Sequence, residues 1–343
     1  MRQAYWTFGV VLVAWWGVQA LSLPKKAPLV AGPDTLLSEV YEELGAEVPN
    51  RPNYALEGVS AEAGRSIVVD GKTVSPSGEV TGRQSKHFVC TSCHNIERED
   101  PDLTVSDPQA RLMYVQGKGL PFLQGTTLYG AINRTSFYNG DYQKKYGDLV
   151  RPARNDIREA IQLCAIECSQ GRPLEDWEIE SVMAYFWTIG FKIEDLGLSE
   201  SEMQGVNDAL AGKGDQAAAA TLLQSKYLSG SPASFVDPPP DRKAGYEELV
   251  GNPENGKVVY DLSCMHCHDK QRYSMFNLDN SKYSFQFLKR HFNRYTRYSV
   301  YQVSRYGTSP MAGKRSYMPN YTFEKLSHQQ MEDLKAYIFE MAD

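Results

Sequence analysis

Two short stretches of the chain place two cysteines and a histidine at the same spacing. Residues 90–94 read CTSCH and residues 264–268 read CMHCH, so the residues concerned are Cys90, Cys93, His94, Cys264, Cys267 and His268. Cys-x-x-Cys-His is the attachment signature of c-type haem, because two thiols add to the haem vinyl groups and the adjacent histidine reaches the iron. A redox-active cysteine pair or half of a zinc site does not require that histidine. The sequence therefore predicts two covalently attached haem c groups, with His94 and His268 as proximal iron ligands.

The two remaining cysteines, Cys164 and Cys168, lie four residues apart in RNDIREAIQLCAIEC. This pattern predicts a helix with Ile157, Ile161 and both cysteines on one face. A regular helix keeps such Cβ atoms ~5–6 Å apart, whereas a disulfide needs ~3.5–4.5 Å, so a disulfide would have to break the helix. Two other interpretations stay open, a pair of small buried side chains or a thiolate that binds haem iron.

Methionines are the other candidate iron ligands. Met311 and Met318 follow the second motif, and Met318 comes 50 residues after His268, far enough for the chain to wrap around a haem. Met113 and Met183 follow the first motif, but Met113 comes early and Met183 fits a helix core better. A methionine in either place could also be an ordinary core residue.

The elements that must position these residues form an approximate repeat. LEDWEIESVMAYF, from Leu174, and LSHQQMEDLKAYI, from Leu326, both predict a helix after a motif, and Ser327 and Gln330 predict a capping box for the second. NGKVVYDLSCMHCH predicts an amphipathic helix leading into the second motif. Before the first motif, residues 66–89 combine a D-G turn with alternating apolar residues, which predicts a hairpin and loop instead.

The domain organisation follows from this repeat. We expect an all-α protein with one domain at 35–210, a linker at 211–245 and a second domain at 246–343. The first domain holds 22 more residues between its motif and its closing helix. Two short helices are predicted at this junction, SESEMQGVNDAL just before the linker and DQAAAATLLQSKYL within it, and a proline-rich extended stretch follows around Pro238–Pro240.

The N-terminus predicts export. An uncharged run at 3–24 lies between Arg2 and Lys25, which fits a signal peptide at 1–20 or a retained membrane anchor. Either one places the rest of the chain outside the cytoplasm, in the periplasm or anchored facing it. The formal net charge of −6 does not favour nucleic acid as a partner.

The two motifs and their closing helices resemble a di-haem class I cytochrome c. The similarity covers the second domain from NGKVVYDLSCMHCH to YMPNYTFEKLSHQQMEDLKAYI. In that family a Met-Pro-aromatic context carries the sixth iron ligand, so the resemblance implies Met318 for haem 2, with Met311 as the alternative.

A narrower resemblance concerns IQLCAIECSQGRPL. It is similar to the segment that carries a cysteine haem ligand in tetrathionate-forming thiosulfate dehydrogenases and in the haem subunit of the Sox system. This implies Cys164 as the distal ligand of haem 1 and as a catalytic residue. Met183, another ligand or an open site are the alternatives, and Cys168 departs from the pattern.

Three functions stay open on these grounds. The first is an exported di-haem cytochrome that carries electrons between periplasmic or membrane-bound redox proteins. The second is a dehydrogenase of thiosulfate or a similar small sulfur anion, and the third is the haem subunit of a membrane-associated respiratory complex. Further residues could bind carboxylates or a partner, or serve structure alone. They are Arg294, Arg297, Arg305, Asn133 and Arg134.

Overall fold

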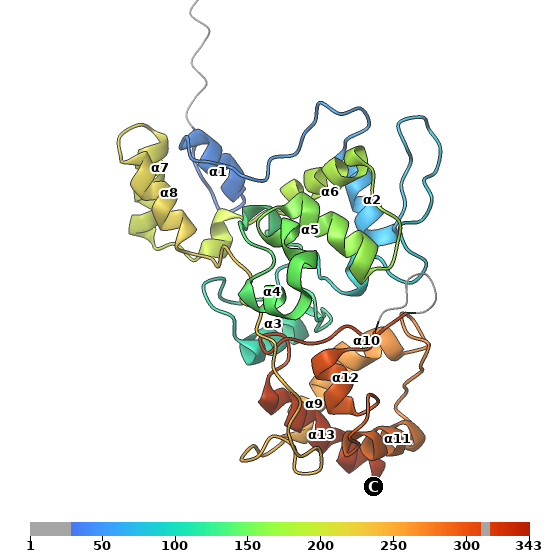
Figure 1. Cartoon of the computed structure of the whole chain (residues 1–343). Coiled ribbons are helices and arrows are strands. Elements are labelled where there is room, and N and C mark those ends of the chain that lie inside the picture. Colours follow the sequence, from blue (N-terminus) through green and yellow to red (C-terminus); the bar gives the residue numbers. More distant parts are fainter. Residues whose placement is uncertain (1–28, 310–315) are drawn as a thin grey trace, which may run out of the picture.

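A computed structural model describes residues 29–309 and 316–343, so the predicted signal or anchor at 1–20 and Met311 lie outside the described residues. The protein is all-α, as predicted, and the described part contains isolated β-bridges but no sheet (Figure 1). None of its helices is long and apolar enough to cross a membrane.

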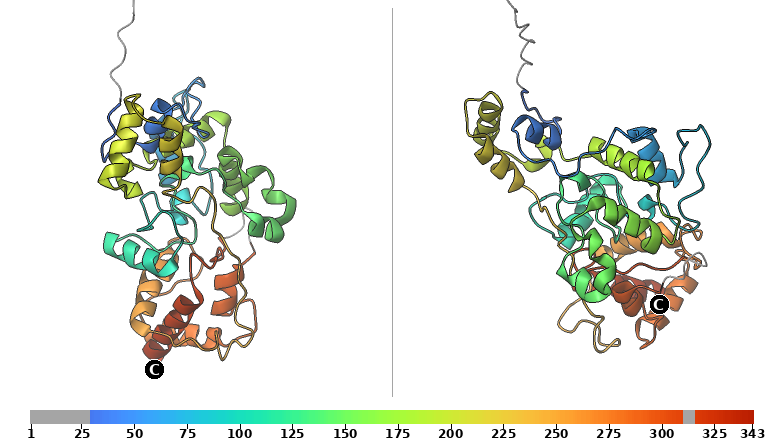
Figure 2. Two further views of the ribbon diagram at one scale, coloured as in Figure 1. Left: turned by 90° about the vertical axis from the view of Figure 1, so that its left-hand side faces the viewer. Right: turned by 45° about the horizontal axis from the view of Figure 1, so that its top comes forward.

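The helices fall into a first half, residues 29–228, and a second half, residues 246–309 and 316–343. The first half contains α1 (Leu37–Glu43), α2 (Ala61–Asp70), α3 (Pro108–Lys118), α4 (Gly140–Tyr146), α5 (Ile157–Leu163), α6 (Asp176–Thr188), α7 (Glu200–Leu210) and α8 (Gln216–Gln224). The second half contains α9 (Pro253–Val259), α10 (Met265–His268), α11 (Lys282–Phe292), α12 (Val300–Tyr306) and α13 (His328–Ala342). In the left view of Figure 2, the second half (orange to red) lies below most of the first half (blue to yellow).

Each half is built on one pair of closely crossing helices, α2 with α6 and α9 with α13. A glycine makes each crossing possible. A Cβ atom on Gly64 would lie 1.8 Å from the carbonyl oxygen of Ser181, and one on Gly256 would lie 1.9 Å from that of Asp333. Because only glycine lets two backbones approach this closely, the two pairs are structurally equivalent elements.

The closing helices of the repeat form as predicted. Ser327 and Gln330 make the predicted capping box of α13, in which the Gln330 amide donates to Ser327 Oγ at 3.1 Å and the Ser327 amide donates to Gln330 Oε1 at 2.9 Å. The predicted helices after residue 199 are α7 and α8, which pack with α1 in a core of their own. Residues 231–239 have no regular structure, as expected for the proline-rich stretch.

The hairpin expected before the first motif is partly wrong. Residues 66–70 are the last turns of α2, and residues 71–89 contain only an isolated antiparallel bridge between Val74 and Val80. These residues are helical because the side chains of Ile67 and Val68 pack against α6. A signal for this was present, since residues 62–65 read EAGR and residues 254–257 read ENGK at the start of α9.

Helix α3 belongs to the first half by sequence but packs into the core of the second (Figure 1). Leu112 and Val115 lie fully buried in one cluster with Tyr260 and Leu334. The chain after α3 stays attached, because the Phe122 amide donates to the Leu262 carbonyl at 2.9 Å. The two halves therefore share a core.

Candidate functional site

The second motif lies on a continuous helical segment. α9 widens into a π turn at Tyr260–Cys264 and continues as α10, which ends at His268. His268 Nδ1 donates to the carbonyl oxygen of Phe276 at 2.9 Å. That bond orients the ring and keeps the proton on Nδ1, so Nε2 carries the lone pair that could bind a metal, which is how ligating histidines are usually held.

A cavity of about 530 Å³ opens beside this motif. Its walls bring together Cys264, Cys267, His268 and Met318 from the second half and Cys93 from the first. The two motifs thus face a common space. The volume is in the range of cofactor pockets.

Two hydrogen bonds between the Met318 backbone and Thr308 fix the position of Met318 at this cavity. The Met318 amide donates to Thr308 Oγ1 at 2.9 Å, and the Thr308 amide donates to the Met318 carbonyl at 2.8 Å. The loop is thereby tied to the end of α12, and Met318 shares the cavity with His268. Met275 also lines it and was missed, because its short distance from His268 in sequence gave no reason to consider it.

The first motif is a short 3₁₀ turn, Cys90–Ser92, that follows extended chain. His94 Nδ1 donates to the carbonyl oxygen of Thr126 at 2.6 Å, so this ring is held in the same way as that of His268. Gln124 Nε2 donates to Cys93 Sγ at 3.4 Å. A Cβ on Gly125 would lie 2.6 Å from the His94 ring, so this loop has to pass tightly over the histidine.

Burial sets the protonation of both motifs. It lowers the pKa of His94 and of His268, which favours the neutral imidazole that binds metals. Burial also raises the pKa of the Cys90 thiol to about 11 and that of Cys264 to about 12. Both thiols are therefore protonated at neutral pH.

The predicted helix around Cys164 ends sooner than expected. α5 stops at Leu163, and Cys164–Cys168 form a π turn closed by a 2.9 Å bond from the Ser169 amide to the Cys164 carbonyl. Ala165, inside this turn, packs in one apolar cluster with Cys90, and Ser85 Oγ donates to the Ser169 carbonyl at 2.5 Å. The turn is thus on the side of the first motif.

The two methionines named for the first motif lie elsewhere. Met183 is fully buried in the core of α2 and α6, and Met113 is 55% exposed on α3. The structure gives Met183 the core position that its sequence context favoured. It brings neither methionine to His94 by any contact described.

A buried ionic cluster joins the first motif to the second half. Glu99 accepts from Lys325 Nζ at 2.7 Å and from Arg111 at 3.2 Å, and all three side chains are at most 5% exposed. Glu99 also accepts from Asn95 Nδ2 at 3.1 Å and from the Thr127 amide at 3.1 Å. Burial alone would disfavour the Glu99 carboxylate, but Arg111 and Lys325 hold its pKa well below its usual range.

Glu99 therefore organises the chain on both sides of His94. Asn95 follows the histidine directly, and Thr127 follows Thr126, whose carbonyl orients the imidazole. This cluster could not be found in the sequence, because Glu99 and Lys325 are 226 residues apart and no local pattern links them.

The arginines of residues 294–305 have different environments. Arg305 is 1% exposed and donates to the carbonyl oxygens of Leu326 and Ser327 at 2.6 Å and 3.1 Å, so it is structural and not available to a partner. Arg297 lines the cavity beside Tyr298. Arg294 bonds to His291, another residue of the cavity wall.

Asn133 and Arg134 also differ. Asn133 Oδ1 accepts from the Phe191 amide at 2.8 Å, which is a structural role. Burial lowers the pKa of Arg134, while the charges of Glu99 and Asp100 act in the opposite direction. Arg134 therefore lies near the buried ionic cluster, as a cation that could receive a carboxylate.

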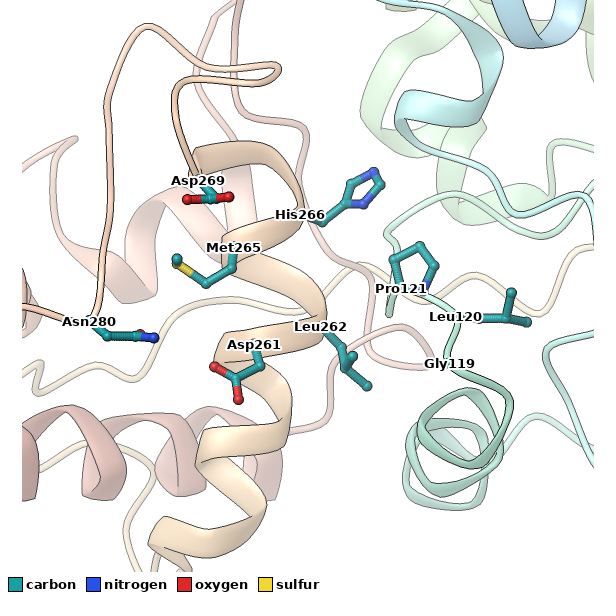
Figure 3. A pocket seen from close by; sticks show the side chains of 9 residues that line it. All are labelled: Gly119, Leu120, Pro121, Asp261, Leu262, Met265, His266, Asp269 and Asn280. Carbon is teal, nitrogen blue, oxygen red and sulfur yellow. The ribbon is translucent and has the colours of Figure 1, made fainter.

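A second cleft, of about 540 Å³, lies where α10 meets the chain after α3 (Figure 3). Asp261 and Asp269 line it, and the ring of His266 points away from both carboxylates. Burial lowers the pKa of His266 to about 4. Throughout residues 29–309 and 316–343, no three His, Cys, Asp or Glu side chains gather as a metal site.

Comparisons with protein-family models, with curated proteins and with solved structures find no match to this chain.

Proposed function

We propose that this protein is an exported di-haem c-type cytochrome that carries electrons between redox partners. The observation that carries the proposal is the matched state of the two histidines. In each motif, Nδ1 donates to a backbone carbonyl, so Nε2 carries the lone pair that could bind iron. Two independent Cys-x-x-Cys-His motifs, each with its histidine held by an Nδ1 hydrogen bond to a backbone carbonyl, favour two proximal iron ligands.

The residues present fit two haem c groups. Cys90 and Cys93 would hold haem 1 with His94, and Cys264 and Cys267 would hold haem 2 with His268. Met318 supports a thioether ligand for haem 2, because it shares the cavity with His268 and its loop is tied to Thr308. When bound, each haem supplies one-electron exchange between ferric and ferrous iron.

The surface around the haem 2 cavity favours an acidic redox partner. Residues 269–297 contain seven Lys and Arg against two Asp, a net charge of +5, which leaves −11 on the rest of the chain. Exposed side chains of Met275, Phe276 and Tyr298 line the cavity between these charges. Positive charges around an apolar cavity mouth can steer a negatively charged protein so that it docks next to haem 2.

The test is the composition and redox behaviour of the exported protein. Haem analysis should give two haem c per chain, and mass spectrometry should show two covalent additions and the state of the N-terminus. Serine variants of Cys93 and of Cys267 should each impair attachment at one motif only. A protein that matures without haem would contradict the proposal.

Oxidation of a sulfur anion is a second candidate function. It is supported by the position of the Cys164–Cys168 turn on the side of the first motif. Cys164 would bind the iron of haem 1, as the resemblance implies, and haem 2 would be the electron exit. Electron paramagnetic resonance should then show a thiolate-type low-spin signal that Cys164→Ser removes, and thiosulfate should reduce ferricyanide catalytically. An unchanged spectrum and no turnover would exclude this function and leave the carrier function intact.

A further inference from the structure

The turn that holds Cys164 and Cys168 does not have regular helix geometry. The π turn at Cys164–Cys168 is wider than an α-helical turn, so the spacing that separates such side chains on a regular helix does not apply. The thiol of Cys168 is hydrogen-bonded to that of Cys164. Both thiols are free, and Cys168 is exposed.

The turn is braced by the chain just before the first motif. Gln84 Nε2 donates to the Ala165 carbonyl at 2.7 Å, and Ser169 Oγ donates to Gln84 Oε1 at 3.0 Å. A Cβ on Gly171 would lie 2.2 Å from the Gln84 carbonyl oxygen, so the exit from the turn is also closely packed. These contacts preorganise the two thiols.

The thiol pair also lies at the first motif. Ala165, which lies between the two cysteines, belongs to one apolar cluster with Cys90 of the motif. Ser85, five residues before Cys90, donates from Oγ to the Ser169 carbonyl at the end of the turn at 2.5 Å. Two adjacent thiols therefore stand within a few side chains of the predicted haem 1.

We propose that Cys164 and Cys168 form a dithiol–disulfide centre that exchanges two electrons with the two haem groups. This rests on the proposed function. In the oxidising direction, a bond forms between the two Sγ atoms, both S–H bonds break, and two protons leave to solvent. Two haem groups in the ferric state, one held by each motif, would take up one electron each.

The test counts electrons and thiols. Protein that is fully reduced and desalted without oxygen is titrated with ferricyanide, then denatured and alkylated with iodoacetamide for mass spectrometry. We expect about four electrons per chain, because the thiol–disulfide couple adds two to those of the haems. We also expect two alkylated cysteines before the titration and none after it.

Cys168→Ser and Cys164→Ser are the matched variants, and each should lower the count to about two electrons while two haem c stay attached. Two electrons in the wild-type protein, with both cysteines still alkylated after oxidation, would overturn the proposal. Failure of the proposed function looks different, since the wild-type protein would then lack haem and all six cysteines would react.

Discussion

Replacing Lys325 with methionine tests whether the buried ionic cluster holds the two halves together. The change removes one of the two cations bonded to Glu99 and leaves a carboxylate that is 0% exposed. Removal of one partner of a buried pair costs about 3–5 kcal/mol. Because Arg111, Asn95 and Thr127 still donate to Glu99, we expect the lower end, about 3 kcal/mol. For a chain of this size, with an unfolding entropy of ~2.1 cal/mol/K per residue, that should lower Tm by roughly 4 °C.

Lys226→Met is the matched control. Lys226 is also bonded to one glutamate, Glu202, at the same 2.7 Å, but these side chains are 22% and 28% exposed, whereas those of Lys325 and Glu99 are 5% and 0% exposed. A surface pair contributes about 0–1 kcal/mol, so this variant should unfold within a degree or two of the wild type. Thermal unfolding followed by far-UV circular dichroism measures both. Equal Tm values for the two variants would refute the argument from burial.

Four further outcomes are expected. Glu99 stays ionised in the folded protein below its ordinary pKa of 4.5, so the unfolded state binds its proton first. The stability from this group is therefore present above about pH 4.5 and lost below it, and Glu99→Gln should flatten that acid limb in a pH series of Tm. Gly256→Ala should cost about 3 kcal/mol through the clash with α13, while Gly205→Ala, in open space on α7, should be neutral or stabilising by calorimetry. Met318→Leu should lower the reduction potential of one haem and not the other in a spectroelectrochemical titration. Arg297→Gln should weaken the salt dependence of electron transfer to an acidic acceptor in stopped-flow traces.

Residues close in sequence were enough to predict the helices that depend on local spacing and capping. The two closing helices could be read from their repeat, and the capping box of α13 from Ser327 and Gln330. The end of α2 was misread, because the β-branched run at 67–69 and the D-G turn after it favour strand and turn chemistry. Packing against α6 overrides that preference, as tertiary contacts often do.

The site could be predicted only in part for the same reason. The motif residues carry their own spacing, so they could be found from the sequence. The π turn at Cys164–Cys168 depends on Gln84, and the ionic cluster depends on Lys325, and both partners are distant in sequence. Such contacts form only once the chain has folded, and no pattern in the neighbouring residues indicates them.

Because α3 packs in the core of the second half, the order of synthesis affects when the first motif is enclosed. During synthesis the first half emerges first, yet the apolar face of α3 has no core to enter until α9 and α13 exist. The Glu99 carboxylate likewise gains its partner Lys325 only when the chain is 226 residues longer. The surroundings of His94 are thus completed last, although its motif is translated first. If the proposed haem 1 is attached before the second half exists, its motif is still open to solvent, and its finished environment forms only with α13.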